Sequence, residues 1–269
     1  MANAKFWSGA AYVGLTIPLL CYSHTLALPL VLGAISARCV YEALNISQFE
    51  EARLIMAPAL LLALLLPVSA VLHALLPVLL CYLFLLLCLL QYLIHYDHLA
   101  LLHIVYCMFF PLLLGSCFLA PLYVRRLPDG LWLLVLTFIG TWSADTCAQF
   151  CGKLFGKHKL GIGVSPNKTV EGCIGSLACT ALACVAFGAL CNRWTTAQFS
   201  LPLMALCGLC ISVAGQIGDL LASAVKRQFQ VKDFSRLIPG HGGMYDRFDS
   251  FALVGPMVYL LARILLQKG

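Results

Sequence analysis

One polar segment, from Ser223 to Asp249, stands out in an otherwise apolar chain. It gathers lysines, arginines, aspartates, a histidine and the pair Gly242–Gly243, although 10% of all residues are charged. Lysine and arginine bind phosphates, carboxylates bind hard metal ions, and glycines let the backbone approach a ligand closely. Because charges beside a lipid bilayer are costly, they usually mark a functional site. The segment therefore predicts phosphate chemistry at a membrane surface.

A polar stripe follows one face of the apolar helix that we predict over residues 201–224. Its members are separated by alternating intervals of four and three residues, which places them on one side of an α-helix. Such a stripe faces a cavity or bonds to a neighbouring helix. The presence of Asp219 favours the interpretation that the stripe faces a cavity, because an acid in a membrane helix is usually functional. The stripe comprises Ser212, Gln216, Asp219, Ser223 and Lys226.

Two further aspartates, Asp246 and Asp249, stand three residues apart at the start of the last predicted helix. Capping of that helix is the simpler explanation for Asp249. Carboxylates that converge beside lysines and arginines suit Mg²⁺ shared between the protein and substrate phosphates. The predicted metal ligands are Asp219 and Asp246, followed by Asp249 and Asp145.

A second polar loop covers residues 152–172. Its part from 163 to 169 resembles a Walker A loop but lacks the glycine before Lys168 and a preceding strand, which excludes that motif. Pro166 fixes a turn, Lys168 is predicted to project toward phosphate, and Glu171 is predicted to open the next helix. Upstream, Asp145 belongs to another polar helix face and is expected to border the same cavity.

Composition predicts an all-α, polytopic integral membrane protein, because hydrophobic residues make up 62% of the 269 residues. The length allows about nine helices of roughly 20 residues, and the absence of short alternating segments excludes a barrel. The 14 cysteines mostly stand singly in apolar runs, where they act as small hydrophobes. The predicted spans are 6–22, 25–43, 54–71, 73–94, 99–123, 131–151, 173–190, 201–224 and 250–266.

Polarity divides the chain into a scaffold, residues 1–130, and a catalytic region, residues 131–269, within a single membrane unit. The first half is expected to be a nearly featureless apolar scaffold, with the intramembrane acids and both polar loops in the second half. Most basic residues of the connecting segments fall on the side of these two loops, which predicts that the loops face the cytoplasm. Basic residues clustered in two loops indicate anionic small ligands and exclude a general nucleic-acid surface.

The polar residues resemble the signature of a known family. The long motif reads Ser223-x2-Lys226-Arg227-x4-Lys232-Asp233-x5-Pro239-x-His241-Gly242-Gly243-x2-Asp246-Arg247-x-Asp249. Two shorter motifs precede it, Asp145-Thr146 with Phe150, and Ser165-Pro-x-Lys168-Thr-x-Glu171-Gly. In this order they resemble the phosphatidate cytidylyltransferases, also called CDP-diacylglycerol synthases.

The resemblance implies the reaction of CTP with phosphatidic acid, using Mg²⁺, to give CDP-diacylglycerol and pyrophosphate at the cytoplasmic (inner) membrane. It also implies a homodimer, for which the sequence contains no motif of its own. A transferase or kinase that uses CTP on another membrane lipid is the nearest alternative, and an anionic solute transporter is a more distant one. The implied catalytic residues are Asp219, Asp246, Lys168, Lys226, Arg227 and His241; the implied substrate-binding residues are Ser165, Glu171, Arg247, Asp145, Ser223, Gly242 and Gly243; and the implied metal ligands are Asp219, Asp246 and Asp249.

Overall fold

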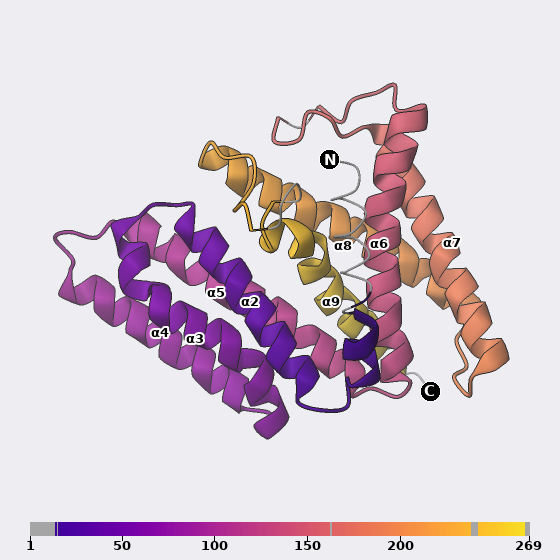
Figure 1. Cartoon of the computed structure of the whole chain (residues 1–269), viewed down its shortest axis with the longest axis horizontal. Helices are drawn as coiled ribbons and strands as arrows, with labels where there is room; N and C mark the ends of the chain where they lie inside the picture. The colour runs from indigo at the N-terminus through magenta and orange to yellow at the C-terminus, as the bar shows by residue number, and fades with distance from the viewer. Residues whose placement is uncertain (1–13, 15, 162, 238–241, 267–269) are drawn as a thin grey trace. The chain divides into compact units, whose positions relative to one another are not determined.

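The computed structural model describes residues 14, 16–161, 163–237 and 242–266. Within these ranges the chain is helical between its connecting loops and forms no β-strand, which confirms the prediction of an all-α protein. Figure 1 shows the named helices, which are α2 (Ala27–Asn45), α3 (Glu50–Leu72), α4 (Leu76–Ile94), α5 (Leu101–Arg125), α6 (Gly130–Phe155), α7 (Val170–Trp194), α8 (Leu201–Gln228) and α9 (Tyr245–Leu266).

These helices coincide with the apolar segments of the sequence to within about one turn at their ends. In the described part of the chain, 7 helices, α2 to α8, are long and apolar enough to cross a membrane. An α-helix satisfies its own backbone hydrogen bonds, which is what an apolar chain requires in lipid. The chain is therefore a multi-pass membrane protein. The exact count of nine spans stays a prediction, since the predicted span 6–22 falls largely outside the described residues.

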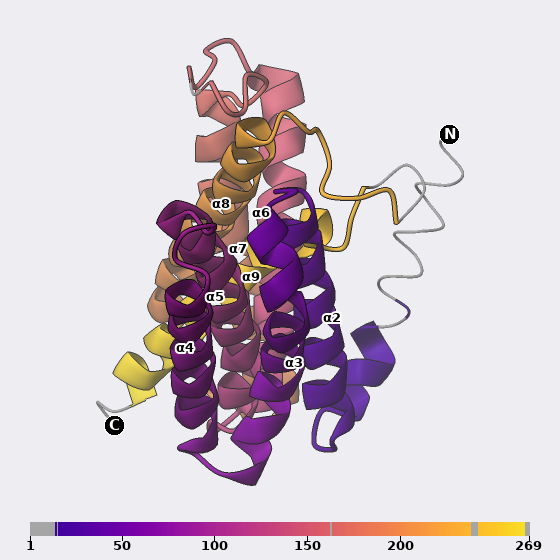
Figure 2. The ribbon, with the colours of Figure 1, turned by 90° about the vertical axis from the view of Figure 1, so that its left-hand side faces the viewer.

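By its internal contacts the chain divides into two compact units. The first holds α2 to α5, up to Leu122, together with Phe229–Phe248, which includes the first turn of α9. Figure 2 shows α2 to α5 running alongside one another, and α3 contacts both α2 and α4. A β-carbon on Gly33 of α2 would collide with the backbone of Leu64 in α3. Small residues of this kind let membrane helices approach closely.

The second unit holds Tyr123–Gln228, which contains α6 to α8, and α9 from Asp249 onward. Helices α6 and α7 form a hairpin (Figure 1), and α8 contacts both of them. Gly208 of α8 lies against α7 so closely that a β-carbon on it would be 2.6 Å from Ala181 Cα. This contact fixes the spacing of α7 and α8. The predicted division into scaffold and catalytic region concerns function and stays a prediction.

Replacing Gly208 by leucine should force α7 and α8 apart, because the new side chain would need the space of Ala181 and its neighbour Thr180. We expect Gly208→Leu to lower the free energy of unfolding by about 1–3 kcal/mol, the usual cost of overpacking. Thermal unfolding of the detergent-solubilised protein measures this. Val213→Leu, at a 44% exposed position of the same helix, is the matched control and should be neutral. Equal stability of both variants would contradict the close contact.

Candidate functional site

Lys168 and Asp219 form an ion pair in the second unit. The Lys168 Nζ atom lies 2.7 Å from Asp219 Oδ2 and 3.4 Å from the backbone oxygen of Gln216. The side chain of Lys168 is 19% exposed and that of Asp219 is 37% exposed. Partial burial strengthens the attraction between the charges while solvent still reaches them. Sequence analysis selected both residues separately, and the structure brings them together.

The loop between α6 and α7 carries Lys168 to this position. Leu160 donates its N–H to the carbonyl oxygen of Lys168 at 2.9 Å, which holds the two arms of the loop together. The hydroxyl of Thr169 accepts the N–H of Gly172 at 3.1 Å and caps α7. The backbone of Lys168 is therefore fixed by the loop on one side and by a capped helix on the other.

Glu171 fastens the same loop from the first turn of α7. Its carboxylate accepts the backbone N–H of His158 at 3.1 and 3.2 Å, and Oε1 lies 2.6 Å from His158 Nδ1. The prediction that Glu171 opens a helix is confirmed. In this structure its carboxylate orders the loop that carries Lys168, and its contact with substrate stays a prediction.

A buried polar network lies behind the ion pair and crosses three helices. Gln216 donates from Nε2 to Ser212 Oγ at 3.1 Å, and Ser212 Oγ lies 2.8 Å from Ser176 Oγ. Ser176 also donates to the carbonyl oxygen of Ala144 at 2.8 Å. Of the predicted stripe on α8, Ser212 and Gln216 thus bond to neighbouring helices. These hydrogen bonds hold Gln216 in place, and the backbone carbonyl oxygen of Gln216 accepts from Lys168.

Asp145 and Asp249 meet at Ser250 in the second unit. The hydroxyl of Ser250 donates to Asp145 Oδ1 at 3.0 Å, and the backbone N–H of Ser250 donates to Asp249 Oδ1 at 2.7 Å. Asp249 is buried, at 8% exposure, and the negative charges of Asp219 and Asp145 both act on it. Lys226 acts on Asp249 with the opposite sign. Burial, together with these negative charges, disfavours the ionised form of Asp249, and a bound cation would offset this effect.

Mg²⁺ places specific demands on a set of carboxylates. Among the described residues, no group of three or more His, Cys, Asp or Glu side chains has the arrangement of a metal site. Mg²⁺ is usually bound by one or two carboxylates, with waters and substrate phosphates completing its shell. Asp219 and Asp249 would supply two such carboxylates, and the substrate would have to complete the shell of the ion.

Asp246 joins two stretches of the first unit, one on either side of residues 238–241. Its Oδ2 accepts the N–H groups of Phe234 at 2.9 Å and Gly243 at 2.8 Å. Gly242 has φ +82°, a left-handed conformation that favours glycine, and a β-carbon there would lie 2.9 Å from the same oxygen. The sequence predicts that the glycine pair lets the backbone approach a ligand closely. In this structure the Gly243 N–H binds Asp246, so a phosphate would have to compete for it.

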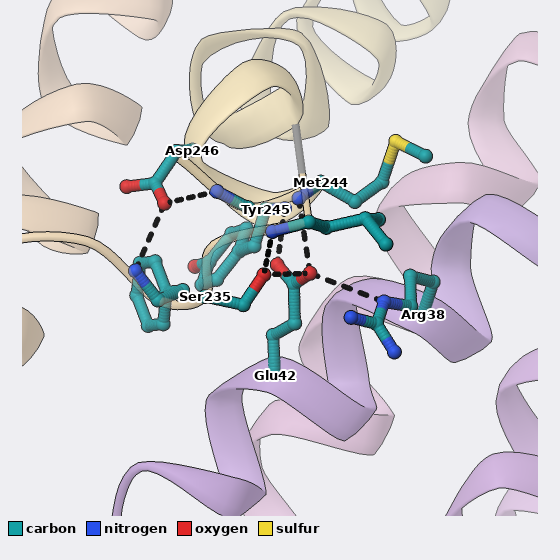
Figure 3. Close-up of polar contacts among 9 residues, drawn as sticks. Arg38, Glu42, Ser235, Met244, Tyr245 and Asp246 are labelled. Atoms are coloured by element: carbon teal, nitrogen blue, oxygen red, sulfur yellow. Dashed lines mark hydrogen bonds and ion pairs between the residues drawn. The ribbon is translucent and has the colours of Figure 1, made fainter. Parts of the chain in front are cut away.

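Glu42 of α2 contacts the same two stretches of chain as Asp246 (Figure 3). The sequence does not single it out. Its side chain is 0% exposed and lies 3.1 Å from Arg38 Nε. It accepts hydrogen bonds from Ser235 Oγ and from the N–H groups of Met244 and Tyr245. The expectation of a nearly featureless first half is therefore wrong, because a buried acid there holds the signature segment. The available signal was an arginine and an acid four residues apart in an apolar helix.

The remaining predicted residues are distributed over both units. Arg247 is exposed in the first turn of α9, and His241 lies outside the described residues. In the second unit the remaining residues are Ser165, in the α6–α7 loop, and Ser223, Lys226 and Arg227, in the last two turns of α8.

Comparison with known proteins adds the family. Among the relatives, the chain is 42% identical over 133 residues to the phosphatidate cytidylyltransferase of Staphylococcus haemolyticus and 43% identical over 135 residues to that of Staphylococcus aureus strain COL. Each match covers 49% of this chain and 50% of the relative, so the chain spans about half the length of the relatives that it matches.

The family match is more extensive than these pairwise ones. The model of the cytidylyltransferase family matches residues 4–265, which include all the candidate site residues and every helix named above except the last residue of α9. The chain therefore belongs to the cytidylyltransferase family.

Proposed function

We propose that this protein transfers the cytidylyl group of CTP to phosphatidate and so forms CDP-diacylglycerol in the membrane. Family membership supports the nucleotide chemistry, and the names of the relatives support the lipid substrate. The structural observation that carries the proposal is the ion pair between Lys168, in the α6–α7 loop, and Asp219 of α8, a helix long enough to span a membrane. Both substrates are anionic and one is a lipid, so a cation held against a membrane helix suits them.

The proposed reaction is an in-line displacement at the α-phosphorus of CTP. An oxygen of the phosphatidate phosphate forms a bond to that phosphorus, and the bond from the phosphorus to the oxygen bridging it to the β-phosphate breaks. The bonding electrons leave with pyrophosphate. Because no covalent enzyme intermediate is needed, the protein contributes position and charge.

Lys168 is the residue that we assign to a phosphate, either of the lipid or of the departing pyrophosphate. Asp219 and the Gln216 carbonyl oxygen hold the ammonium group in place before a substrate arrives. Charge that is oriented in advance needs no reorganisation during the reaction, which is why it lowers the barrier. Lys226, Arg227 and Arg247 are assigned to the remaining phosphate charges.

Mg²⁺ is the proposed cofactor, with Asp219, Asp246 and Asp249 as its proposed protein ligands. The repulsion that Asp219 exerts on buried Asp249 supports this assignment, since a cation would relieve it. When bound, the ion would neutralise charge on the triphosphate. We further propose that substrates contact Ser165, Glu171, Asp145, Ser223, His241, Gly242 and Gly243.

The proposed location is the cytoplasmic membrane, with both polar loops facing the cytoplasm. The clustering of lysine and arginine in these loops supports this orientation. CTP would then arrive from the cytoplasm, and the acyl chains of phosphatidate would remain in the bilayer.

Removing the ion pair should reduce the rate without unfolding the protein. We expect Lys168→Ala and Asp219→Asn each to lower kcat/KM for CTP by about 100- to 1,000-fold, as happens when one preorganised charge-stabilising group is lost. Pyrophosphate release by the detergent-purified protein with CTP, phosphatidate and Mg²⁺ measures this, with each component omitted in turn.

Lys153→Ala serves as the control for this series, because Lys153 is an exposed lysine near the end of α6. Its rate should equal that of the unchanged protein. Ordinary turnover by Asp219→Asn would remove the main assignment. Turnover with another lipid phosphate in place of phosphatidate would redirect the proposal to that lipid.

Chelation should stop the reaction if Mg²⁺ is bound jointly by the aspartates and the triphosphate. We expect no pyrophosphate release in excess EDTA and full recovery when Mg²⁺ is restored. Asp249→Asn should require a higher Mg²⁺ concentration for its half-maximal rate, since one ligand oxygen is replaced by a weaker one. A rate that is unaffected by EDTA would contradict the proposed cofactor.

A further inference from the structure

We propose that Glu42 is a positioning residue for the reaction, which holds the segment 229–248 in the geometry that meets the substrate phosphates. This inference rests on the proposed function, because cytidylyl transfer is what the segment would serve. Glu42 lies in α2, far from the segment in sequence, yet both belong to the first unit. The inference therefore concerns contacts within one unit.

The Glu42 carboxylate is buried among hydrogen-bond donors that the segment supplies. Its side chain is 0% exposed, and a buried carboxylate without partners is strongly unfavourable. Oε1 accepts from Ser235 Oγ at 2.8 Å and from the Met244 N–H at 3.1 Å, while Oε2 accepts from the Tyr245 N–H at 2.9 Å. Carboxylate and segment depend on each other, because moving either leaves polar groups of the other unsatisfied.

Glu42 also supplies the N-terminal cap that the sequence next to α9 lacks. The helix begins at Tyr245, and the preceding Met244 has no side-chain oxygen to accept the exposed N–H groups. Asp246 turns its Oδ2 back to the Gly243 N–H. Glu42 therefore accepts the N–H groups at the helix start, where a negative group is also favoured by the helix dipole.

The carboxylates of Glu42 and Asp246 link the stretch of the segment before residues 238–241 to the stretch after them, as Figure 3 shows. Glu42 joins Ser235, before residues 238–241, to Tyr245, after them. Asp246 joins Phe234 to Gly243 in the same way. Gly242, which we assign to a substrate contact, directly precedes Gly243, whose N–H binds Asp246. Bridges of this kind remove conformational freedom before the substrate binds, which favours a productive geometry.

Gly243 indicates how closely Glu42 approaches the segment. A β-carbon on Gly243 would collide with Glu42 Oε2 and would lie 2.9 Å from Ser235 Oγ. Any side chain at this position would displace the carboxylate from its donors. The second glycine of the pair is therefore required by Glu42, independently of any ligand.

The test compares Glu42→Gln with Leu32→Ala in the full-length, detergent-purified protein. Glutamine keeps the shape of the side chain but replaces one acceptor oxygen by a donor that would face the donors of the segment. Leu32, 1% exposed in the same helix, is the matched control, because its truncation removes packing and no hydrogen bond. Both variants are measured for thermal unfolding, for hydrogen–deuterium exchange of residues 242–248, and for kcat and KM with CTP, phosphatidate and Mg²⁺.

We expect Glu42→Gln to speed exchange of the Met244 and Tyr245 amides and to lower kcat about 100-fold, the effect of a small misplacement of reacting groups. Leu32→Ala should unfold at a lower temperature, with kcat and amide exchange of the segment close to those of the unchanged protein. Ordinary kcat or unchanged exchange in Glu42→Gln would overturn the inference and leave the proposed function intact. If the wild-type protein itself does not turn over CTP and phosphatidate, the proposed function is wrong and the positioning role fails with it.

A second variant covers the case in which Glu42→Gln does not fold. Ser235→Ala removes one donor and leaves the two backbone hydrogen bonds to Glu42 in place. We expect this protein to fold and to show a smaller fall in kcat, with faster amide exchange in residues 242–248. Full kcat together with unchanged exchange in Ser235→Ala would overturn the positioning role.

Discussion

A charged side chain inside an apolar helical protein must find its partners within the protein, because hydrocarbon supplies no hydrogen bonds. The organisation of both units follows from this requirement. In the second unit Asp219 is paired with Lys168, and the loop that delivers the lysine is closed by its own hydrogen bonds. In the first unit Glu42 is satisfied by donors from the segment around Met244. Pairing a buried charge therefore also determines where a loop is held.

The carboxylates of this protein serve two kinds of purpose. Asp219, Asp145 and Asp249 stand near one another's charges, which is unfavourable for them and favourable for a bound cation. Glu42 and Asp246 accept backbone N–H groups and give a loop its shape, and Asp246 is in addition a proposed Mg²⁺ ligand. The first arrangement is typical of a ligand-binding site, and the second is typical of residues that support the shape of such a site. Residue type alone does not separate the two, because each uses the same acid chemistry.

The helices were predictable because each apolar run is long and bounded by polar or turn-forming residues, as at Asp129–Gly130. The stripe on α8 was predictable from spacing, since residues four and three apart share a helix face. The partner of Asp219 was not, because the loop of Lys168 is positioned by hydrogen bonds that no local pattern encodes. Glu42 was missed for the same reason. Apart from Arg38, its donors lie 193 to 203 residues away, and the glycine that accommodates it suggested a ligand instead.

The long separation between Glu42 and its donors also matters while the chain is being made. α2 is synthesised early, whereas Ser235 and Tyr245 follow 193 and 203 residues later, when most of the helices have already left the ribosome. During that interval Arg38, one helical turn before Glu42, is the partner near enough in sequence to share its carboxylate. An arginine four residues before the acid can share its charge as soon as α2 has formed, and the hydrogen bonds from Ser235 and Tyr245 are added once the later part of the chain is in place.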